Sequence, residues 1–312
     1  MSQISMSATV QPTLVPARPA AAAPSGVETI IKPKQGWIGV DWAELVSHRE
    51  LLAFLVWRDV KVKYKQAIFG SAWAIVVPLV QVLIYSGIGI LAGFSTRTNG
   101  DAPYTVWMYA GLLPWLFISA AISSGGLSLI NNQTLLSKIY MPRLFIPAAM
   151  IGSSFVDMLM SGLVFCGTMA FFILKSNFHW WPNWHIVFVP FLTLLLIITA
   201  MGTAFLLSAL TVMFRDLRFI IPFITQLGIW LTAVAFPQTI FVFKHADGTV
   251  TDYRPWLALN PFAGIIQAFR WAITGEPLQV LQLTSSIIFG VVLFIFGAFY
   301  FKRVERRFAD IA

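Results

Sequence analysis

Three cations at the edge of the first long apolar run have the spacing of a binding surface. Arg58, Lys61 and Lys65 stand in the stretch RDVKVKYKQ. The alternation of Lys with Val and Tyr has the period of a strand, yet in a helix the three cations fall at i, i+3 and i+7 and share one face. Such a face binds anionic groups, and each cation near a membrane contributes about 1 kcal/mol of attraction to anionic lipid. Lys63 lies on another side of this helix, where it can pair with Asp59 at i−4.

Catalytic and metal-binding patterns are absent from the sequence. No Gly is followed by Lys, which excludes a P-loop for ATP hydrolysis, and no GxSxG motif marks a nucleophile. The four His residues are scattered and Cys166 is the only cysteine. We therefore expect no metal site, no intrachain disulfide and no cofactor in this chain. Any activity of this chain that needs energy would therefore draw it from a partner or from an ion gradient.

The composition identifies the elements that must position these residues. Of the 312 residues, 58% are hydrophobic and only 11% are charged, and the mean hydropathy is +0.77. A soluble protein needs more surface charge, and several uncharged stretches exceed the roughly 20 residues that cross a bilayer as a helix. We predict an all-α integral membrane protein with six transmembrane helices. Their approximate bounds are Ile68–Phe94, Tyr104–Leu127, Leu144–Leu174, Ile186–Phe214, Phe219–Pro237 and Gln279–Phe301.

Charge and composition divide the chain further. Residues 1–36 are rich in Ala, Pro and Ser, which predicts a disordered cytoplasmic tail. Residues 37–67 predict an amphipathic helix on the inner membrane interface, with Leu52 and Val56 on its apolar side, and residues 68–312 form the six-span domain. Most of the 21 Lys and Arg residues then lie on the side of the N-terminus, which predicts that both termini are cytoplasmic. The same bias explains the net charge of +8 without nucleic acid.

One carboxylate, Asp157, falls within the third predicted span. Ionisable residues inside spans mark substrate or proton sites, which is one interpretation of this residue. The alternative is a structural role, in which Asp157 faces a water-filled interior or pairs with the hydroxyls of Ser153, Ser154 or Ser161. A single carboxylate is a weak basis for a proton relay, which favours the structural role.

The longest outer segment lies between the fifth and sixth spans. IFVFKHADGTVTDYRPW predicts a small hairpin that turns at Asp247 and Gly248. The apolar stretch that follows, Pro261 to Ile273, is too short to cross a membrane. We expect it to form a short re-entrant or interfacial helix.

Four blocks of the sequence, in this order, carry a resemblance to a known family. They are WRDVKVKYKQAIFGSAWAIVVPLVQVLIY, FRDLRFIIPFITQLGIWLTAVAFP, LNPFAGIIQAFRWAITG and YFKRVERRFAD. From about Asp41 onward the chain resembles the permease subunit of polysaccharide-exporting ABC transporters. The Wzm-like O-antigen exporters are the nearest type, and teichoic-acid and capsule exporters are similar. The segment before Trp37 departs from the family pattern.

The resemblance implies a channel-forming homodimer in the bacterial cytoplasmic (inner) membrane, without enzymatic activity of its own. Two separate ATPase subunits, which bind ATP and Mg²⁺, would drive it from the cytoplasmic side. The substrate would be a polyprenyl-pyrophosphate-linked polysaccharide of the O-antigen type. Its lipid head would arrive laterally from the membrane lipid of the inner leaflet.

Residues at the inner side acquire roles from this resemblance, each with a simpler alternative. Arg58, Lys61 and Lys65 would bind the lipid pyrophosphate on an interfacial gate helix, or would only anchor that helix to anionic lipid. The connector between the second and third spans would fit the ATPase, or would be a polar loop with two topological anchors. The residues expected to couple to the ATPase are Asn131, Gln133, Lys138, Tyr140 and Arg143.

Residues toward the outer side also have two interpretations each, one from the resemblance and one from packing. The aromatic residues of the second span would contact the passing glycan, or would simply pack. They are Trp107, Tyr109, Trp115 and Phe117. Arg270 and Trp271 would belong to an outer gate, or would lie in a packed interfacial helix from which Arg270 extends outward.

Two other functions stay open on the sequence alone. One is an ABC permease for another amphipathic substrate, such as teichoic acid, capsule or lipid. The other is a membrane-embedded glycan-processing enzyme, which would need a cluster of catalytic side chains. The acidic residues of the outer segments form no recognisable motif; they are Asp101, Asp247, Asp252 and Glu276.

Overall fold

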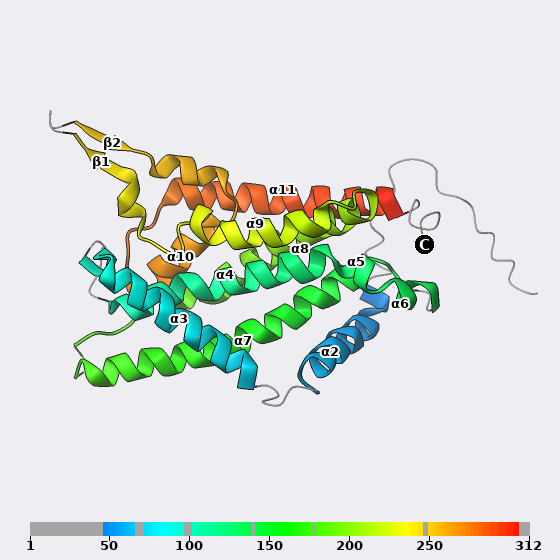
Figure 1. Cartoon of the computed structure of the whole chain (residues 1–312), viewed down its shortest axis with the longest axis horizontal. Helices are drawn as coiled ribbons and strands as arrows, with labels where there is room; N and C mark the ends of the chain where they lie inside the picture. Colours follow the sequence, from blue (N-terminus) through cyan, green and yellow to red (C-terminus); the bar gives the residue numbers. More distant parts are fainter. Residues whose placement is uncertain are drawn as a thin grey trace, which may run out of the picture. The chain divides into compact units, whose positions relative to one another are not determined.

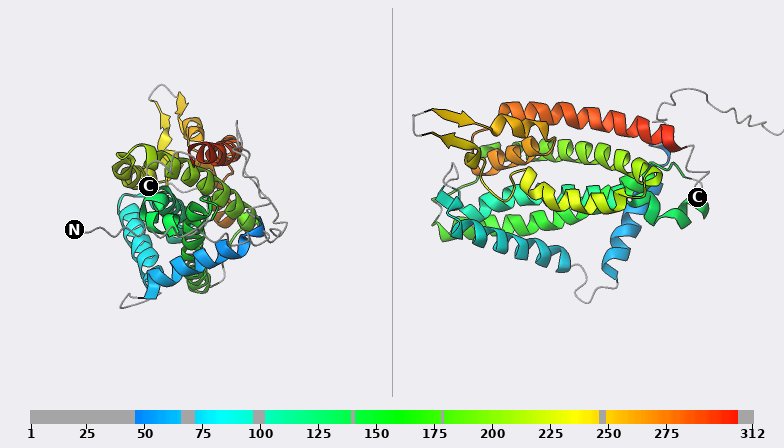
Figure 2. Two further views of the ribbon diagram at one scale, coloured as in Figure 1. Left: turned by 90° about the vertical axis from the view of Figure 1, so that its right-hand side faces the viewer. Right: turned by 45° about the horizontal axis from the view of Figure 1, so that its top comes forward.

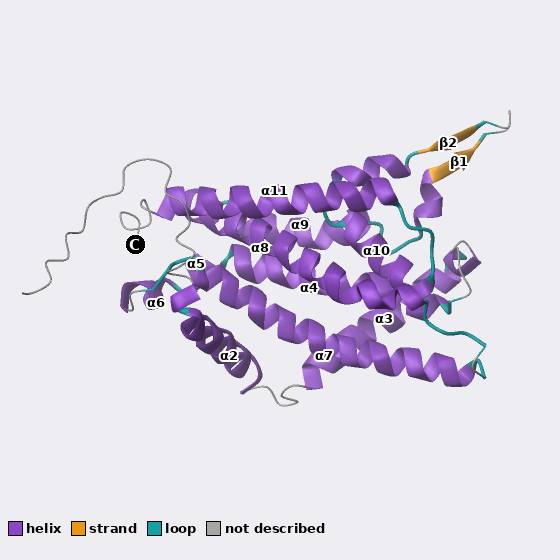
Figure 3. Cartoon of the chain, turned by 180° about the vertical axis from the view of Figure 1, so that it is seen from behind, coloured by secondary structure: helices purple, strands orange, loops and turns teal. Residues whose placement is uncertain are grey.

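Helices make up nearly all of the chain that the structure describes (Figures 1 and 3). The computed structural model describes residues 46–65, 72–96, 102–138, 141–177, 179–245 and 249–305. The predicted N-terminal tail, Tyr140 and the predicted turn at Asp247 and Gly248 lie outside these residues.

The described helices fall into a longer and a shorter group. The five longer helices are α3 (Trp73–Leu91), α4 (Tyr104–Gly126), α7 (Phe145–Lys175), α8 (Val189–Met213) and α11 (Val280–Val304). The other helices are α2 (Arg49–Lys65), α5 (Ser128–Asn131), α6 (Gln133–Lys138), α9 (Leu217–Leu231) and α10 (Ala263–Thr274). The short 3₁₀ helices are η2 (Phe94–Thr96), η3 (Trp184–Phe188), η4 (Gln238–Phe241) and η5 (Arg254–Leu259).

Five helices are long and apolar enough to cross a membrane: α3, α4, α7, the continuous helix Trp184–Met213, and α11. They coincide with five of the six predicted spans to within a few residues at each end. The predicted fifth span, Phe219–Pro237, is wrong at its second boundary, because α9 ends at Leu231. Ala233 adopts a positive φ of 54°, which no α-helix can continue through. The 15 residues of α9 extend about 22 Å, less than the roughly 30 Å of a hydrocarbon core.

Helix α4 is the centre of the bundle, packed against α3, α7, α8, α9 and α10. Small residues allow its neighbours to approach. A Cβ at Gly125 would lie 2.7 Å from the Cβ of Ala204 in α8, and one at Gly126 would lie 2.9 Å from Ile221 Cδ1 in α9. Close approach through small residues is the usual way in which membrane helices gain packing energy, since lipid supplies no hydrophobic drive between them.

Helices α8 and α11 pack together along their lengths for the same reason. A Cβ at Gly202 would lie 2.4 Å from the backbone nitrogen of Phe294, and one at Gly297 would lie 2.3 Å from the Gly202 oxygen. Backbone therefore meets backbone at this contact. Any side chain larger than hydrogen at Gly202 would force the two helices apart.

The two ends of the bundle differ in structure (Figures 1 and 2). At the hairpin end, β1 (Val242–Lys244) and β2 (Val250–Asp252) pair antiparallel, which confirms the predicted hairpin. At the opposite end, called here the α2 end, α2 crosses the other helices obliquely, as the left view of Figure 2 shows. Leu55 of α2 is buried there, and Val56 packs against Gly152 of α7, where a Cβ would lie 2.6 Å from Val56 Cγ2.

Candidate functional site

The charged residues of α2 form two ion pairs. Arg58 donates to Asp59 Oδ1 from Nη2 at 2.6 Å and from Nε at 2.9 Å. Lys63 donates to Asp157 Oδ2 in α7. The predicted pair between Lys63 and Asp59 is therefore wrong. Asp59 is occupied by its sequence neighbour, and α2 packs close enough to α7 for Lys63 to reach across.

Asp157 is the point at which α7 holds α2. Its second oxygen, Oδ1, accepts a hydrogen bond from the Tyr64 hydroxyl. Burial, followed by this hydrogen bond and the charge of Asp157, raises the pKa of the Tyr64 hydroxyl. The side chain of Asp157 is 20% exposed, and its partners are Lys63 and Tyr64 rather than the predicted serine hydroxyls. We name these three residues the α2 latch; sequence analysis missed Tyr64 because its partner is 93 residues away.

Lys61 and Lys65 lie on the exposed side of α2. Within the described part of the chain neither has an acidic partner, whereas Arg58 is paired with Asp59. The predicted stripe of three cations therefore reduces to two unpaired ammonium groups beside one neutralised guanidinium. Two unpaired cations next to apolar, membrane-length helices can bind an anionic headgroup.

A polar cavity of about 670 Å³ is lined by residues of α2, α4 and α7. Residues from the α5 region line it too. Its polar wall includes Asp59, Lys63, Ser123, Ser124, Asn131 and Ser153. The cavity therefore has hydroxyls, an amide and a carboxylate in one place at the α2 end.

The connector between α4 and α7 folds into the two short helices α5 and α6 at the α2 end. Asn131 and Gln133 are exposed there. Lys138 is the last residue of α6, and Tyr140 lies outside the described residues. Arg143 Nη1 donates to the backbone oxygen of Glu305, 2.8 Å away, which ties the connector to the end of α11.

The four aromatic residues predicted to line a channel lie in the core instead. Trp107, Tyr109, Trp115 and Phe117 are between 1% and 6% exposed. Tyr109 donates to the backbone oxygen of Ser161 at 3.0 Å, and Trp115 packs against Gly228 of α9, where a Cβ would lie 2.2 Å from the ring. In this conformation the four rings pack in the core, which was the alternative to the channel interpretation.

Arg270 of α10 is completely buried at the hairpin end. Its guanidinium donates to the backbone oxygens of Ala233 at 3.0 Å and Val234 at 2.7 Å, directly after α9. The interpretation that Arg270 extends outward is wrong. The carbonyl groups of the non-helical segment after α9 need donors in a buried place, and Arg270 supplies them.

The face of the Trp107 ring covers this guanidinium, with Arg270 Cζ 3.7 Å from the ring centroid. Gly111, one turn along α4, leaves the space: a Cβ there would lie 2.7 Å from Arg270 Nε. The spacing of Trp107 and Gly111 at i and i+4 is the only sequence signal for this site, and it is too common to identify one. Trp271, also predicted at an outer gate, is partly exposed and packs against His185, with ring centroids 4.3 Å apart.

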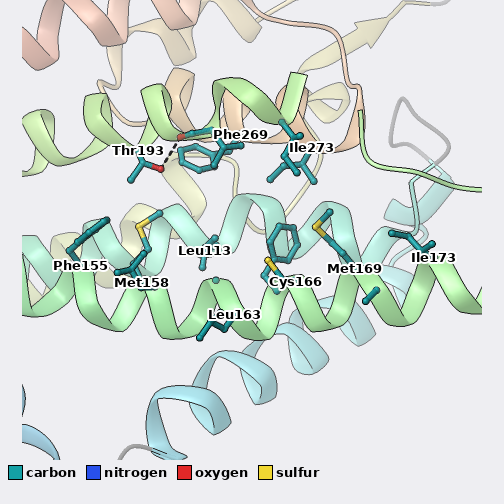
Figure 4. Close-up of a pocket in the computed structure, with 16 residues that line it drawn as sticks. Leu113, Phe155, Met158, Leu163, Cys166, Met169, Ile173, Thr193, Phe269 and Ile273 are labelled. Carbon is teal, nitrogen blue, oxygen red and sulfur yellow. Dashed lines mark hydrogen bonds between the residues drawn. The ribbon is translucent and has the colours of Figure 1, made fainter. Parts of the chain in front are cut away.

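A second cavity, of about 480 Å³, is apolar and lies among α4, α7, α8 and α10 (Figure 4). Met158, Cys166 and Met169 enter it from α7, and Phe269 and Ile273 from α10. Thr193 lines it too, but its hydroxyl donates to the Val189 oxygen at 2.8 Å. Within these walls only hydrocarbon-like groups would find partners.

An apolar bundle of membrane-length helices defines a multi-pass membrane protein. The class follows from these features alone. The chain belongs to the ABC-2 type transporter family, whose profile matches residues 50–274. The match runs from the start of α2 to the end of α10, so it includes both charged centres.

Curated relatives are similar over most of the chain. An O-antigen export system permease protein, RfbA, of Myxococcus xanthus is 25% identical over 260 residues, covering 81% of this chain and 94% of the relative. The protein of the same name from Klebsiella pneumoniae is 28% identical over 273 residues, covering 84% and 95%. The polysialic acid transport protein KpsM of Escherichia coli is 25% identical over 256 residues, covering 80% and 91%.

Proposed function

We propose that this chain is the membrane-spanning subunit of an ATP-driven exporter that moves polyprenyl-pyrophosphate-linked polysaccharide of the O-antigen type across the bacterial cytoplasmic membrane. The observation that carries the proposal is the position of Lys61 and Lys65. They are unpaired among the described residues and exposed on a helix that lies across one end of an apolar bundle. The names of the similar O-antigen export permeases support the class of substrate.

In this proposal α9 is the fifth of six crossings, extended by the non-helical segment after Leu231. The α2 end faces the cytoplasm with both termini, and α2 lies on the inner interface. Helix α10 is a re-entrant segment that closes the outer side, with Arg270 and Trp271 in its wall. The burial of α10 on nearly every side supports a segment inside the bundle rather than on its surface.

The energy source is a separate ATPase. We assign two ATPase subunits, with their ATP and Mg²⁺, to a homodimer of this chain. Helix α6 and its flanking residues are the docking segment, since Asn131 and Gln133 are exposed beside it. Arg143 links this docking segment to the end of α11. In this proposal it passes movement of the ATPase on to α11, in addition to any contact with the ATPase itself.

Another amphipathic substrate is the second candidate, and the similarity to a polysialic acid transport protein favours a capsule-type polymer.

The contacts of two outer acidic residues do not favour a glycan-processing enzyme. Asp252 is paired with Arg254 at 2.5 Å, and Glu276 is buried and accepts from Gln267 at 2.9 Å. Neither of these two carboxylates is an exposed, unpaired catalytic group.

The test is the double substitution Lys61→Gln/Lys65→Gln in cells whose own copy of this permease is deleted. If each cation contributes about 1 kcal/mol, capture of the lipid-linked substrate weakens roughly tenfold to thirtyfold. We expect surface polysaccharide to fall while the permease still co-purifies with its ATPase.

The matched control is Arg215→Gln/Arg218→Gln, which removes the same charge from exposed residues elsewhere on the chain. Normal export by the lysine variant, or an equal loss in the arginine control, would reject the proposed role of α2. Export by the chain without any ATPase would reject the proposed class of transporter.

A further inference from the structure

The polar cavity between α2, α4 and α7 has the features of a ligand site. Its volume of about 670 Å³ falls in the range of about 300–1,000 Å³ typical of small-molecule sites. Four separate segments of the chain contribute to its wall. A cavity with this many polar groups would not stay dry, so water or a polar ligand fills it.

The charges around the cavity cancel one another. Lys63 is held by Asp157, and Asp59 is held by Arg58. An anionic ligand such as a diphosphate would therefore meet no unpaired cation in this wall and would face the carboxylate of Asp59. A neutral ligand suits the cavity better, because it disturbs neither ion pair.

Hydroxyl groups are the functional groups that match the wall. Ser123 and Ser153 can each donate and accept, and the amide of Asn131 can do both as well. Asp59 Oδ2 is buried away from solvent, without a hydrogen-bond donor among the described residues, so a ligand in the cavity reaches it only if the side chain turns. The serine hydroxyls and the Asn131 amide are therefore the groups that meet the O–H groups of a ligand.

The cavity and the two unpaired lysines lie on different sides of α2. A helix with its side chains is about 10–12 Å across. A lipid-linked glycan that wraps around α2 can therefore place its diphosphate on Lys61 and Lys65 and a sugar unit in the cavity. This arrangement divides recognition into an anionic part and a neutral part.

We infer that the cavity between α2, α4 and α7 is a binding site for a neutral sugar unit close to the diphosphate of the lipid-linked glycan. The inference rests on the proposed function and deepens it, since it assigns sugar recognition to Ser123, Ser153 and Asn131. It also gives the permease a means to distinguish a glycosylated lipid from the bare lipid diphosphate.

The experiment compares two probes on the purified full-length chain in lipid nanodiscs. One is farnesyl diphosphate, and the other is farnesyl diphosphate that carries a disaccharide. We expect the wild-type chain to bind the sugar-bearing probe about tenfold more tightly, as a few added hydrogen bonds would give. Intrinsic tryptophan fluorescence or microscale thermophoresis measures both dissociation constants.

The variant Ser123→Val/Ser153→Val separates the two parts of recognition. We expect it to bind both probes with affinities within about twofold of each other, and to bind farnesyl diphosphate as the wild type does. Ser285→Val, a matched change in α11 outside the cavity, should keep the preference. Lys61→Gln/Lys65→Gln should weaken both probes by the same factor and keep the preference too.

Equal affinities of the wild type for the two probes would overturn the sugar site and leave the proposed function standing. Retention of the full preference by the serine variant would also overturn it. Failure of the wild type to bind either probe would count against the proposed function itself.

Discussion

Lys63 at the α2 end and Arg270 at the hairpin end each link a helix to another part of the chain, but in different surroundings. The Lys63 side chain is 52% exposed and pairs with a carboxylate. Arg270 is completely buried and binds two backbone oxygens under the face of Trp107. Water can replace the first set of contacts, whereas nothing nearby can replace the second.

This difference predicts where the chain can move. Exposed ion pairs contribute about 0–1 kcal/mol, because water screens the charges and side-chain entropy opposes the pair. A buried group that loses its partner costs several times more. We therefore interpret the α2 latch as a contact that opens and closes, and Arg270 as part of a fixed frame around the end of α9.

Replacement of Arg270 by Leu is expected to have the largest effect. The carbonyl groups of Ala233 and Val234 would lose their donors in a buried place, and the free energy of unfolding should fall by about 3 kcal/mol or more. Denaturant unfolding of the purified chain in detergent measures the change. Arg270→Lys should recover only part of it, because an ammonium lacks the two-pronged geometry of a guanidinium.

The control for this variant is Arg218→Leu, at an exposed position of α9. It should change stability by less than about 0.5 kcal/mol. If the two substitutions lowered the free energy of unfolding equally, Arg270 would not be part of a fixed frame around the end of α9.

A smaller effect is expected from Gly111→Ala, which tests how tightly the frame is packed. The added methyl group would lie 2.7 Å from both Nε and Nη2 of Arg270. Overpacking of this kind costs about 1–3 kcal/mol when the neighbour cannot move. Gly87→Ala in α3 is the matched control, since nothing lies within 4 Å of its added Cβ; it should be neutral or slightly stabilising. Equal stability of the two variants would mean that Arg270 moves easily.

The α2 latch should give the opposite pattern, a small change in stability with a large change in motion. Asp157→Asn is expected to lower the free energy of unfolding by less than about 1 kcal/mol. Hydrogen–deuterium exchange in α2 should nevertheless become faster, because Lys63 and Tyr64 lose their shared acceptor. The reversed pair Lys63→Asp/Asp157→Lys should restore protection in part.

Asp59→Asn is the control for the latch, since Asp59 pairs only with Arg58 within α2 itself. It should leave exchange in α2 close to that of the wild type. Unchanged exchange in Asp157→Asn would show that apolar packing around Leu55 alone holds the helix.

Hydropathy predicts the spanning helices of this chain well, and the end of α9 is its one clear failure among them. The apolar run from Phe219 to Pro237 continues without a charge, so nothing in it marks the end of α9 at Leu231. The break depends on Ala233 at positive φ and on a guanidinium that reaches its neighbours from 37 residues further along the chain. Backbone acceptors have no sequence signature, because every residue carries one.

The ion pairs show a second limit of sequence reasoning. Asp59 at i−4 was a plausible partner for Lys63, and only the crossing of α2 over α7 brings Asp157 nearer. Composition rules also placed Arg270 on an outer surface, since they count the side of the membrane and not the depth. The exposed Lys61 and Lys65 could be predicted, because exposed groups on a helix depend on period alone.

The smallest expected effect concerns the ion pair between Asp252 in β2 and Arg254. Like the α2 latch this pair is partly exposed, but it links no two helices of the bundle. The hydrogen bond from Arg254 holds the pKa of this carboxyl below its usual value. The native state therefore holds fewer protons here than the unfolded state. The pair stabilises the hairpin above the unfolded pKa of about 4, and this contribution is lost as the pH falls through the lowered native value.

Asp252→Asn should speed hydrogen exchange in β1 and β2 slightly at pH 7, by a factor that corresponds to less than about 1 kcal/mol. The difference from the wild type should shrink as the pH falls below about 4, and it should vanish below the lowered native pKa of Asp252, where both chains lack the charge. Exchange in α2 should be unaffected at either pH. A pH-dependent change in α2 would mean that the two ends of the bundle are coupled, and the separation of a fixed end from a moving end would then have to be abandoned.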